Sequence, residues 1–137
     1  MIVADTSAIL ALIDRSDRHH RAVTAIYRAH ADTWILPWSI LPEVDYLLAS
    51  HVSPRAAAAF LGDLAAGAFH LEWGEEGDLE RADHLCRQHR DLNLGLVDAT
   101  VIATSERLDA EAIATLDLRH FGAVAIIGAP RLLPRDA

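Results

Sequence analysis

The sequence of 137 residues contains no lysine, so all 12 of its basic side chains are arginine. A P-loop requires the tripeptide Gly-Lys-Ser/Thr, and phospho-receiver and haloacid-dehalogenase-type sites depend on a lysine at the end of a strand. The absence of lysine therefore excludes these three kinds of phosphate site unless another residue replaces the lysine.

Positive charge is also scarce in total. The formal net charge is −8 at pH 7, whereas proteins that bind nucleic acid over a broad surface usually have a basic balance. Any such activity here needs local positive charge. The single cysteine, Cys86, excludes an intramolecular disulfide and suits a reducing compartment. We therefore expect the chain to act in the cytoplasm.

Long hydrophobic runs are missing as well. The apolar stretch at residues 1–13 contains Asp5 and has neither a basic leader nor a small-residue cleavage site. We expect neither a signal peptide nor a membrane span. The length suits one domain over residues 1–137, and no repeat, low-complexity tract or Gly/Ser/Pro-rich linker interrupts it.

Short apolar strands alternate with helical patterns along the chain. This alternation predicts an α/β fold with a mostly parallel central sheet and helices on both faces. Ser39 is a plausible N-cap with Pro42 in the first turn that follows, and Ser53-Pro54 opens an alanine-rich helix. The last residues, with Pro130 and Pro134, look irregular. The predicted strands are residues 1–5, 34–37, 69–73, 112–117 and 123–127, and the predicted helices are 6–14, 18–30, 39–50, 53–66, 78–89 and 94–108.

Two aspartates follow predicted strands. Asp5 ends the first strand, and Asp117 ends the segment that follows the helix at residues 94–108. Ligands of open parallel sheets bind beyond the carboxyl ends of the strands, so both side chains are expected at one edge. Each also has an ordinary alternative, since Asp5 can cap the next helix and Asp117 can be a turn residue.

A third aspartate lies in a helix whose inward side chains are otherwise apolar. Asp98 shares a helix face with Leu94, Val101 and Ile102. A carboxylate buried there needs hydrogen bonds, an ion-pair partner or a metal to remain charged. We therefore expect a functional role for Asp98.

A fourth acid is less well defined by its pattern. The apolar face of the helix at residues 39–50 has Glu43 on one margin and Asp45 on the other, so periodicity does not choose between them. Three or four carboxylates at one sheet edge raise each other's pKa values unless a divalent cation holds them ionised. Ligation by oxygen alone points to magnesium or manganese.

Four features together resemble, in order and spacing, the PIN-domain ribonucleases, and specifically the VapC toxins of bacterial and archaeal toxin–antitoxin pairs. They are VADTS at 3–7, Glu43, LGLVDATVIATSERL at 94–108 and IATLDLRHF at 113–121. The resemblance covers essentially the whole chain and implies a single PIN-like domain over residues 1–137. His89 and Asn93 stand where the family often has an aromatic residue and a proline, a departure that affects loop shape.

The resemblance also assigns roles to residues of this sequence. It favours Glu43 over Asp45 as the helical acid, and it places small hydroxyl side chains beside the acids, where they can orient a carboxylate or bind a water at the metal. The implied catalytic and metal-binding quartet is Asp5, Glu43, Asp98 and Asp117, with Thr6, Ser7 and Thr115 in supporting positions.

The activity implied by the resemblance is that of a Mg²⁺-dependent endoribonuclease, with Mn²⁺ as a substitute, in which metal-activated water attacks an RNA phosphodiester. The implied partners are an RNA substrate, a VapB-type antitoxin and a second copy in a homodimer, with no membrane. Three alternatives remain open: a non-catalytic PIN-like binding domain, a non-toxin RNA-processing nuclease, and a small phosphotransfer enzyme on another doubly wound fold.

Aromatic and basic residues near the predicted site have two interpretations. His120 and Arg119 are candidates for contact with substrate phosphate, and Phe121 is expected in the core. Trp34, Trp38 and Trp73 can be stacking surfaces for single-stranded RNA, but core packing at strand ends is the interpretation we favour.

Overall fold

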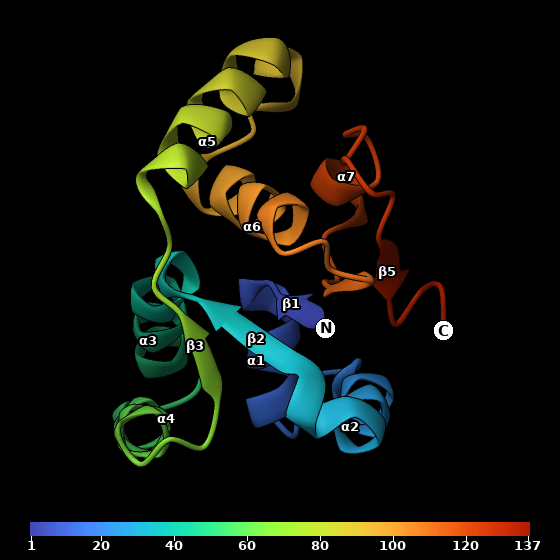
Figure 1. Cartoon of the computed structure of the whole chain (residues 1–137). Helices are drawn as coiled ribbons and strands as arrows, with labels where there is room; N and C mark the ends of the chain where they lie inside the picture. Colours follow the sequence, from blue (N-terminus) through green and yellow to red (C-terminus); the bar gives the residue numbers. More distant parts are fainter.

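The computed structural model describes all residues 1–137 and contains one five-stranded sheet with helices around it (Figure 1). The strand order is β3-β2-β1-β4-β5, and every neighbouring pair is parallel. The predicted α/β class is confirmed, and the sheet is entirely parallel. The strands are β1 (Ile2–Ala4), β2 (Trp34–Pro37), β3 (His70–Glu72), β4 (Ala112–Ala114) and β5 (Arg131–Leu133).

Seven α-helices connect and cover these strands. In Figure 1, α5 and α6 lie on one side of the sheet, and α1 and α2 lie on the other. Helix α6 packs on β1 and β2 with α5 outside it, and α1 packs against α2 and α3. The helices are α1 (Thr6–Ile13), α2 (His20–His30), α3 (Leu41–His51), α4 (Pro54–Ala65), α5 (Glu76–Gln88), α6 (Leu96–Arg107) and α7 (Leu118–Phe121).

The central strands are buried on both faces. Ile2, Val3 and Ala4 of β1 are fully buried, and β4 is buried along its whole length. Parallel strands with helices on both faces read as continuous apolar runs, which is why IVA and AIA carry no polar alternation. None of the helices combines the length and the apolar character needed to cross a membrane.

The prediction of a strand at residues 123–127 is wrong. Helix α7 begins at the carboxyl end of β4, and a parallel strand must start at the opposite edge of the sheet. The chain therefore uses residues 122–130 to return, and β5 forms at Arg131–Leu133, where Arg131 pairs with Ala112. This strand lies in the tail that we expected to be irregular. Gly128 and Ala129 adopt positive φ in the turn before it.

The helix at residues 39–50 begins later than predicted. Ile40 is at the N-cap of α3, and Ser39 lies in a short 3₁₀ helix, η2 (Trp38–Ile40). The predicted cap is therefore wrong, and the Ser39 hydroxyl instead accepts a hydrogen bond from the Thr100 hydroxyl of α6 at 2.7 Å. The second predicted helix start is confirmed, since Ser53 caps α4 by accepting from the Ala56 N–H at 3.0 Å.

Two of the three tryptophans are not in the core. Trp34 is buried as expected, but Trp38 and Trp73 are 50% and 64% exposed and pack on each other with ring centroids 4.9 Å apart. Trp38 follows β2, and Trp73 follows β3, the strand at one edge of the sheet. Phe121 is buried, as predicted.

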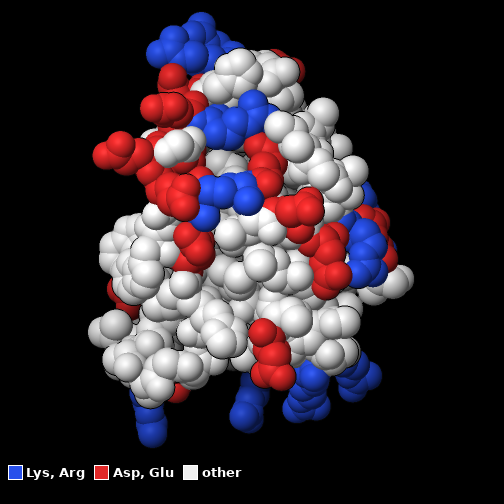
Figure 2. All heavy atoms as spheres, in the orientation of Figure 1, with Lys and Arg blue, Asp and Glu red and all other residues white.

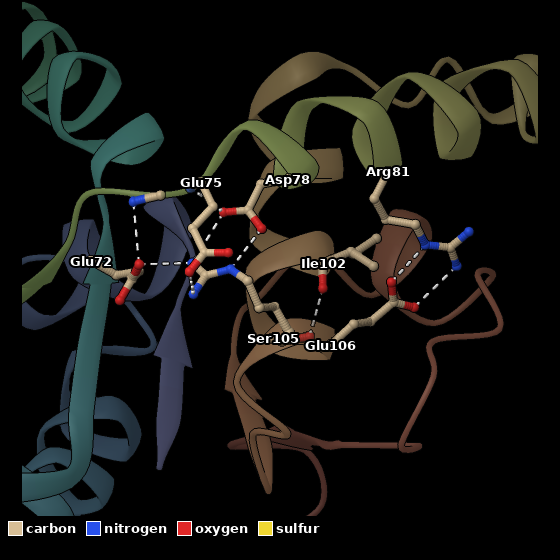
Figure 3. Close-up of polar contacts among 9 residues, drawn as sticks. Glu72, Glu75, Asp78, Arg81, Ile102, Ser105 and Glu106 are labelled. Carbon is tan, nitrogen blue, oxygen red and sulfur yellow. Dashed lines mark hydrogen bonds and ion pairs between the residues drawn. The ribbon is translucent and has the colours of Figure 1, made fainter.

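Ion pairs fasten α5 to α6 (Figure 3). The guanidinium of Arg107 donates to Asp78 at 2.8 and 3.0 Å and to Glu72 at 2.7 Å, and Arg81 donates to Glu106 at 2.7 and 3.1 Å. Asp78 also accepts the Glu75 N–H, which completes the capping box of α5. These contacts hold α6, the helix that carries Asp98, against its outer neighbour.

Candidate active site

Asp5 and Thr115 lie at the point where the order of the strands reverses. From β1 the chain proceeds to β2 and β3 on one side, whereas β4 and β5 lie on the other side. Asp5 follows β1 and donates its N–H to the Ala114 carbonyl of β4 at 2.9 Å, and Thr115 follows β4 directly. Ligands of open α/β sheets bind in the crevice at this switch point. The first predicted site residue therefore lies where the topology favours a binding site.

Two hydroxyl groups hold the Asp5 carboxylate. Ser7 and Thr115 donate to its Oδ2 at 3.0 and 2.8 Å. Each hydroxyl also accepts a backbone N–H, that of Leu116 for Ser7 and that of Asp117 for Thr115. Because an ionised carboxylate only accepts, each hydroxyl gives its single proton to Asp5 and accepts the N–H through a lone pair. Asp5 does occupy the N-cap position of α1, but its side chain makes no capping hydrogen bond, so capping does not account for this carboxylate.

Burial of Asp5 makes its charge costly. The side chain is almost fully buried, and this desolvation raises the pKa of Asp5 to about 6, although the hydroxyl bonds from Thr115 and Ser7 favour the charged form. The neighbouring charge of Asp98 raises the pKa further. The two aspartates are therefore close enough to repel each other.

His120 lies between Asp98 and Asp117. Its Nδ1 is 3.1 Å from Oδ2 of Asp98 and 2.9 Å from Oδ2 of Asp117. The sequence pattern predicted Asp98 inside a helix over residues 94–108, but α6 begins at Leu96, so Asp98 lies in its first turn. Asp117 also accepts the backbone N–H of His120 at 3.2 Å and so caps α7, whereas the local alternative considered from the sequence was a turn residue.

The structure distinguishes Glu43 from Asp45. Burial raises the pKa of Asp98, His120 lowers it, and the charges of Asp117 and Glu43 raise it. Glu43 is partly buried in the first turn of α3 and acts on Asp98, whereas Asp45 is exposed. The structure thus places Glu43 within electrostatic range of Asp98, and it leaves Asp45 exposed on the same helix.

The donor set fits a divalent cation. Asp98, Asp117 and His120 each offer one ligand atom, and these atoms lie within 4.8 Å of one another. The hydroxyl of Thr6, next to Asp5, is buried and has no hydrogen-bond partner. Raised carboxylate pKa values and an unpartnered buried oxygen are both relieved by a cation with its waters. The donors are carboxylate oxygens and one imidazole nitrogen.

The contact of His120 with two acids was missed in the sequence. The pattern suggested only that His120 touches substrate, and that contact stays a prediction. The signal that was available is the spacing of Asp117 and His120, which are three residues apart and therefore share a face of one helical turn. The partner from α6 is a tertiary contact that no local spacing reveals.

The comparison with known families decides the classification of this fold and site. The PIN domain family model matches residues 2–127. The chain belongs to the PIN domain family. Ribonuclease VapC26 of Mycobacterium tuberculosis (strain ATCC 25618 / H37Rv) is 34% identical to this PIN domain over 130 residues, which is 95% of this chain and 96% of the relative. The resemblance to VapC proteins is therefore confirmed.

Solved structures share the architecture of this PIN domain. The crystal structure of Mycobacterium tuberculosis VapC20, a Sarcin-Ricin loop cleaving toxin, has a TM-score of 0.83 at 22% identity and covers 95% of this chain and 99% of its own. The DNA-bound VapBC of Salmonella typhimurium has a TM-score of 0.70 at 15% identity, with 96% of this chain and 95% of that chain covered. These likenesses establish the fold.

Replacement of Asp5 by asparagine tests how much the buried charge of Asp5 destabilises the folded protein. The folded-state pKa of about 6 lies above the unfolded value of 3.8, so the wild type binds more protons folded than unfolded between these values. Its stability therefore falls as pH rises through this window, by about 3 kcal/mol at most. We expect metal-free Asp5→Asn to be more stable than wild type above pH 7 and equal to it below about pH 4.

The measurement is urea unfolding in chelator across pH 4–8. Asp45→Asn is the matched control because Asp45 is exposed, and its unfolding profile should follow that of the wild type. A constant difference between Asp5→Asn and wild type across the pH range would contradict the buried charge.

Proposed function

We propose that this PIN domain is a metal-dependent endoribonuclease and the toxin of a type II toxin–antitoxin pair. The observation that carries the proposal is the convergence of Asp5, Glu43, Asp98 and Asp117 at the switch point of the sheet. The similarity of the whole chain to Ribonuclease VapC26 supports the choice of RNA as substrate and of phosphodiester hydrolysis as the reaction. We propose the cytoplasm as the place of action.

The residues of the site divide the work of hydrolysis. The cation, Mg²⁺ with Mn²⁺ as a substitute, supplies when bound an activated water and neutralisation of the phosphate charge. The four carboxylates hold the cation, and their metal-binding role is part of the proposal. Ser7 and Thr115 restrain rotation of the Asp5 carboxylate through Oδ2.

Positive charge near the site has to come from few residues. In Figure 2 acidic side chains gather around α5 and α6, and several arginines project at the lower edge, near α2 and α4. Arg119 is exposed, forms no ion pair and lies two residues after Asp117, the N-cap of α7. We propose that Arg119 contacts the phosphate backbone of RNA next to the carboxylates.

The alternatives predict a different behaviour of the acids. A non-catalytic PIN-like binding domain has no need for an acidic cluster in which the pKa values of Asp5 and Asp98 are raised, so this cluster favours an enzyme. An RNA-processing nuclease that is not a toxin would use the same site and the same chemistry as a toxin ribonuclease. These two candidate functions are therefore distinguished by whether an antitoxin binds the chain, and not by the residues of the site.

Cleavage of RNA by matched variants tests the nuclease proposal. Glu43→Gln removes a charge from the cluster and should lower the cleavage rate at least a hundredfold, whereas Asp45→Asn on the same helix should change it less than twofold. The measurement is cleavage of total RNA in Mg²⁺, with chelator as a control, followed by analysis of the product ends. Attack by water leaves a 5′-phosphate and a 3′-hydroxyl.

Three results would reject this chemistry: normal cleavage by Glu43→Gln, cleavage in chelator, or a cyclic phosphate at the 3′ end. Loss of activity in Asp45→Asn with normal activity in Glu43→Gln would show that the fourth acid had been misassigned.

We further propose an antitoxin and a second copy as partners. An antitoxin's arginine near Asp5, Asp98 and Asp117 fits the negative charge of the site, since a guanidinium binds a pair of carboxylates through two hydrogen bonds. For the homodimer, the candidate surface is the apolar face formed by Trp38, Trp73, Leu79 and Leu96, which are exposed around a hollow of about 490 Å³. A twofold axis there places identical apolar side chains against each other.

Co-expression tests both partners. The chain is expressed together with the open reading frame that neighbours its gene and purified by a tag on this chain, and the molar mass of the purified species is measured by light scattering. We expect a complex with two copies of this chain. Leu79→Arg should reduce the number of copies to one, whereas Leu61→Arg should not, because Leu61 is equally exposed but lies on α4. Recovery of this chain alone, active and tolerated by its host, would contradict the toxin proposal.

A further inference from the structure

We infer that His120 is a direct ligand of the cation through Nδ1, so that the site binds Mn²⁺ more tightly than its carboxylates alone would. The inference rests on the proposed function of the same site. Its basis is the position of the imidazole ring between two carboxylates that belong to different helices.

The orientation of the ring is fixed by a backbone carbonyl. Nε2 of His120 lies 2.9 Å from the Leu92 oxygen, and because a carbonyl only accepts, Nε2 carries a proton and donates it. Nδ1 faces the carboxylates of Asp98 and Asp117 and donates to them in the metal-free protein, so a cation that binds Nδ1 takes the place of its proton, which leaves to solvent. Histidines that bind metals through one nitrogen nearly always donate the other N–H to a carbonyl or carboxylate, which fixes the tautomer. His120 has this arrangement.

The distances around Nδ1 fit neighbouring positions of one coordination sphere. Ligands of an octahedral cation lie about 2.1 Å from the metal, so adjacent ligand atoms are about 3 Å apart. Nδ1 is 2.9 Å from Asp117 Oδ2 and 3.1 Å from Asp98 Oδ2. These two distances, together with the limit of 4.8 Å on the separation of all three ligand atoms, allow one cation to contact all three.

The side chains of Asp117 and His120 are held next to each other by the backbone. The Asp117 carboxylate accepts the backbone N–H of His120 at 3.2 Å, since Asp117 is the N-cap of α7 and His120 lies in its single turn. Asp98 approaches from the first turn of α6. The three donors are thus held by two short backbone segments, and the carbonyl of Leu92 comes from a third, η3 (Arg90–Leu92).

The nature of the donor predicts a preference among metals. Imidazole nitrogen suits transition metals, whereas Mg²⁺ is held mainly by oxygen ligands. Loss of His120 should therefore weaken Mn²⁺ binding more than Mg²⁺ binding. If His120 were only a hydrogen-bond donor occupying the metal's place between the two carboxylates, its loss would strengthen the binding of both ions.

Metal titration of the full chain tests the inference. Binding of Mn²⁺ alone and Mg²⁺ alone is measured by calorimetry for wild type, His120→Ala and His120→Asn, with His84→Asn as the control because His84 is exposed on α5. We expect His120→Ala to lower Mn²⁺ affinity about ten- to hundredfold. In His120→Asn an amide oxygen replaces Nδ1, so the preference for Mn²⁺ over Mg²⁺ should fall while Mg²⁺ binding is largely kept. His84→Asn should match wild type.

A spectroscopic signature provides a second readout. Pulsed electron paramagnetic resonance of the Mn²⁺-loaded wild type should show coupling to a ¹⁴N nucleus, and His120→Asn should lose this coupling while it stays folded by circular dichroism. Absence of ¹⁴N coupling in the wild type, or unchanged or tighter Mn²⁺ binding in both variants, overturns the inference. If the wild type binds neither ion, the proposed function itself fails, so the two failures are distinguishable.

Discussion

The buried carboxylate of Asp5 is the constraint on which the site depends. It lies between the ends of β1 and β4, where burial raises its pKa to about 6 and the charge of Asp98 raises it further. Hydroxyls from Ser7 of α1 and Thr115 after β4 compensate part of this cost. The same two hydroxyls accept backbone N–H groups of residues 116 and 117, so the support of Asp5 also fixes the segment that carries Asp117.

The surrounding fold brings the other acids to this point. Asp98 reaches the cluster from the first turn of α6, and α6 is held against α5 by the ion pairs of Arg107 and Arg81. Glu43 comes from the first turn of α3. Carboxylates from separate elements are therefore kept together against their mutual repulsion, and we propose that a divalent cation removes this repulsion when it binds.

Much of this arrangement could be predicted because its signals are local. Apolar runs and helical spacing predicted the alternation of strands and helices. The positions of Asp5 and Asp117 at the ends of predicted strands indicated that both lie at the same edge of the sheet. Other features depend on tertiary contacts. The edge strand formed at Arg131–Leu133 instead of 123–127 because the chain first returns across the sheet, and the Leu92 carbonyl that orients His120 is 28 residues away. The exposure of Trp38 and Trp73 depends on which strand ends the helices leave uncovered.

The most direct test of the account is a crystal structure of the chain grown with Mn²⁺, with anomalous diffraction recorded at the manganese absorption edge. The account predicts an anomalous peak in the crevice between the ends of β1 and β4, within coordination distance of Asp98 and Asp117. A peak only at other acidic residues, or none at manganese concentrations that support RNA cleavage, would contradict a metal centre at this sheet edge.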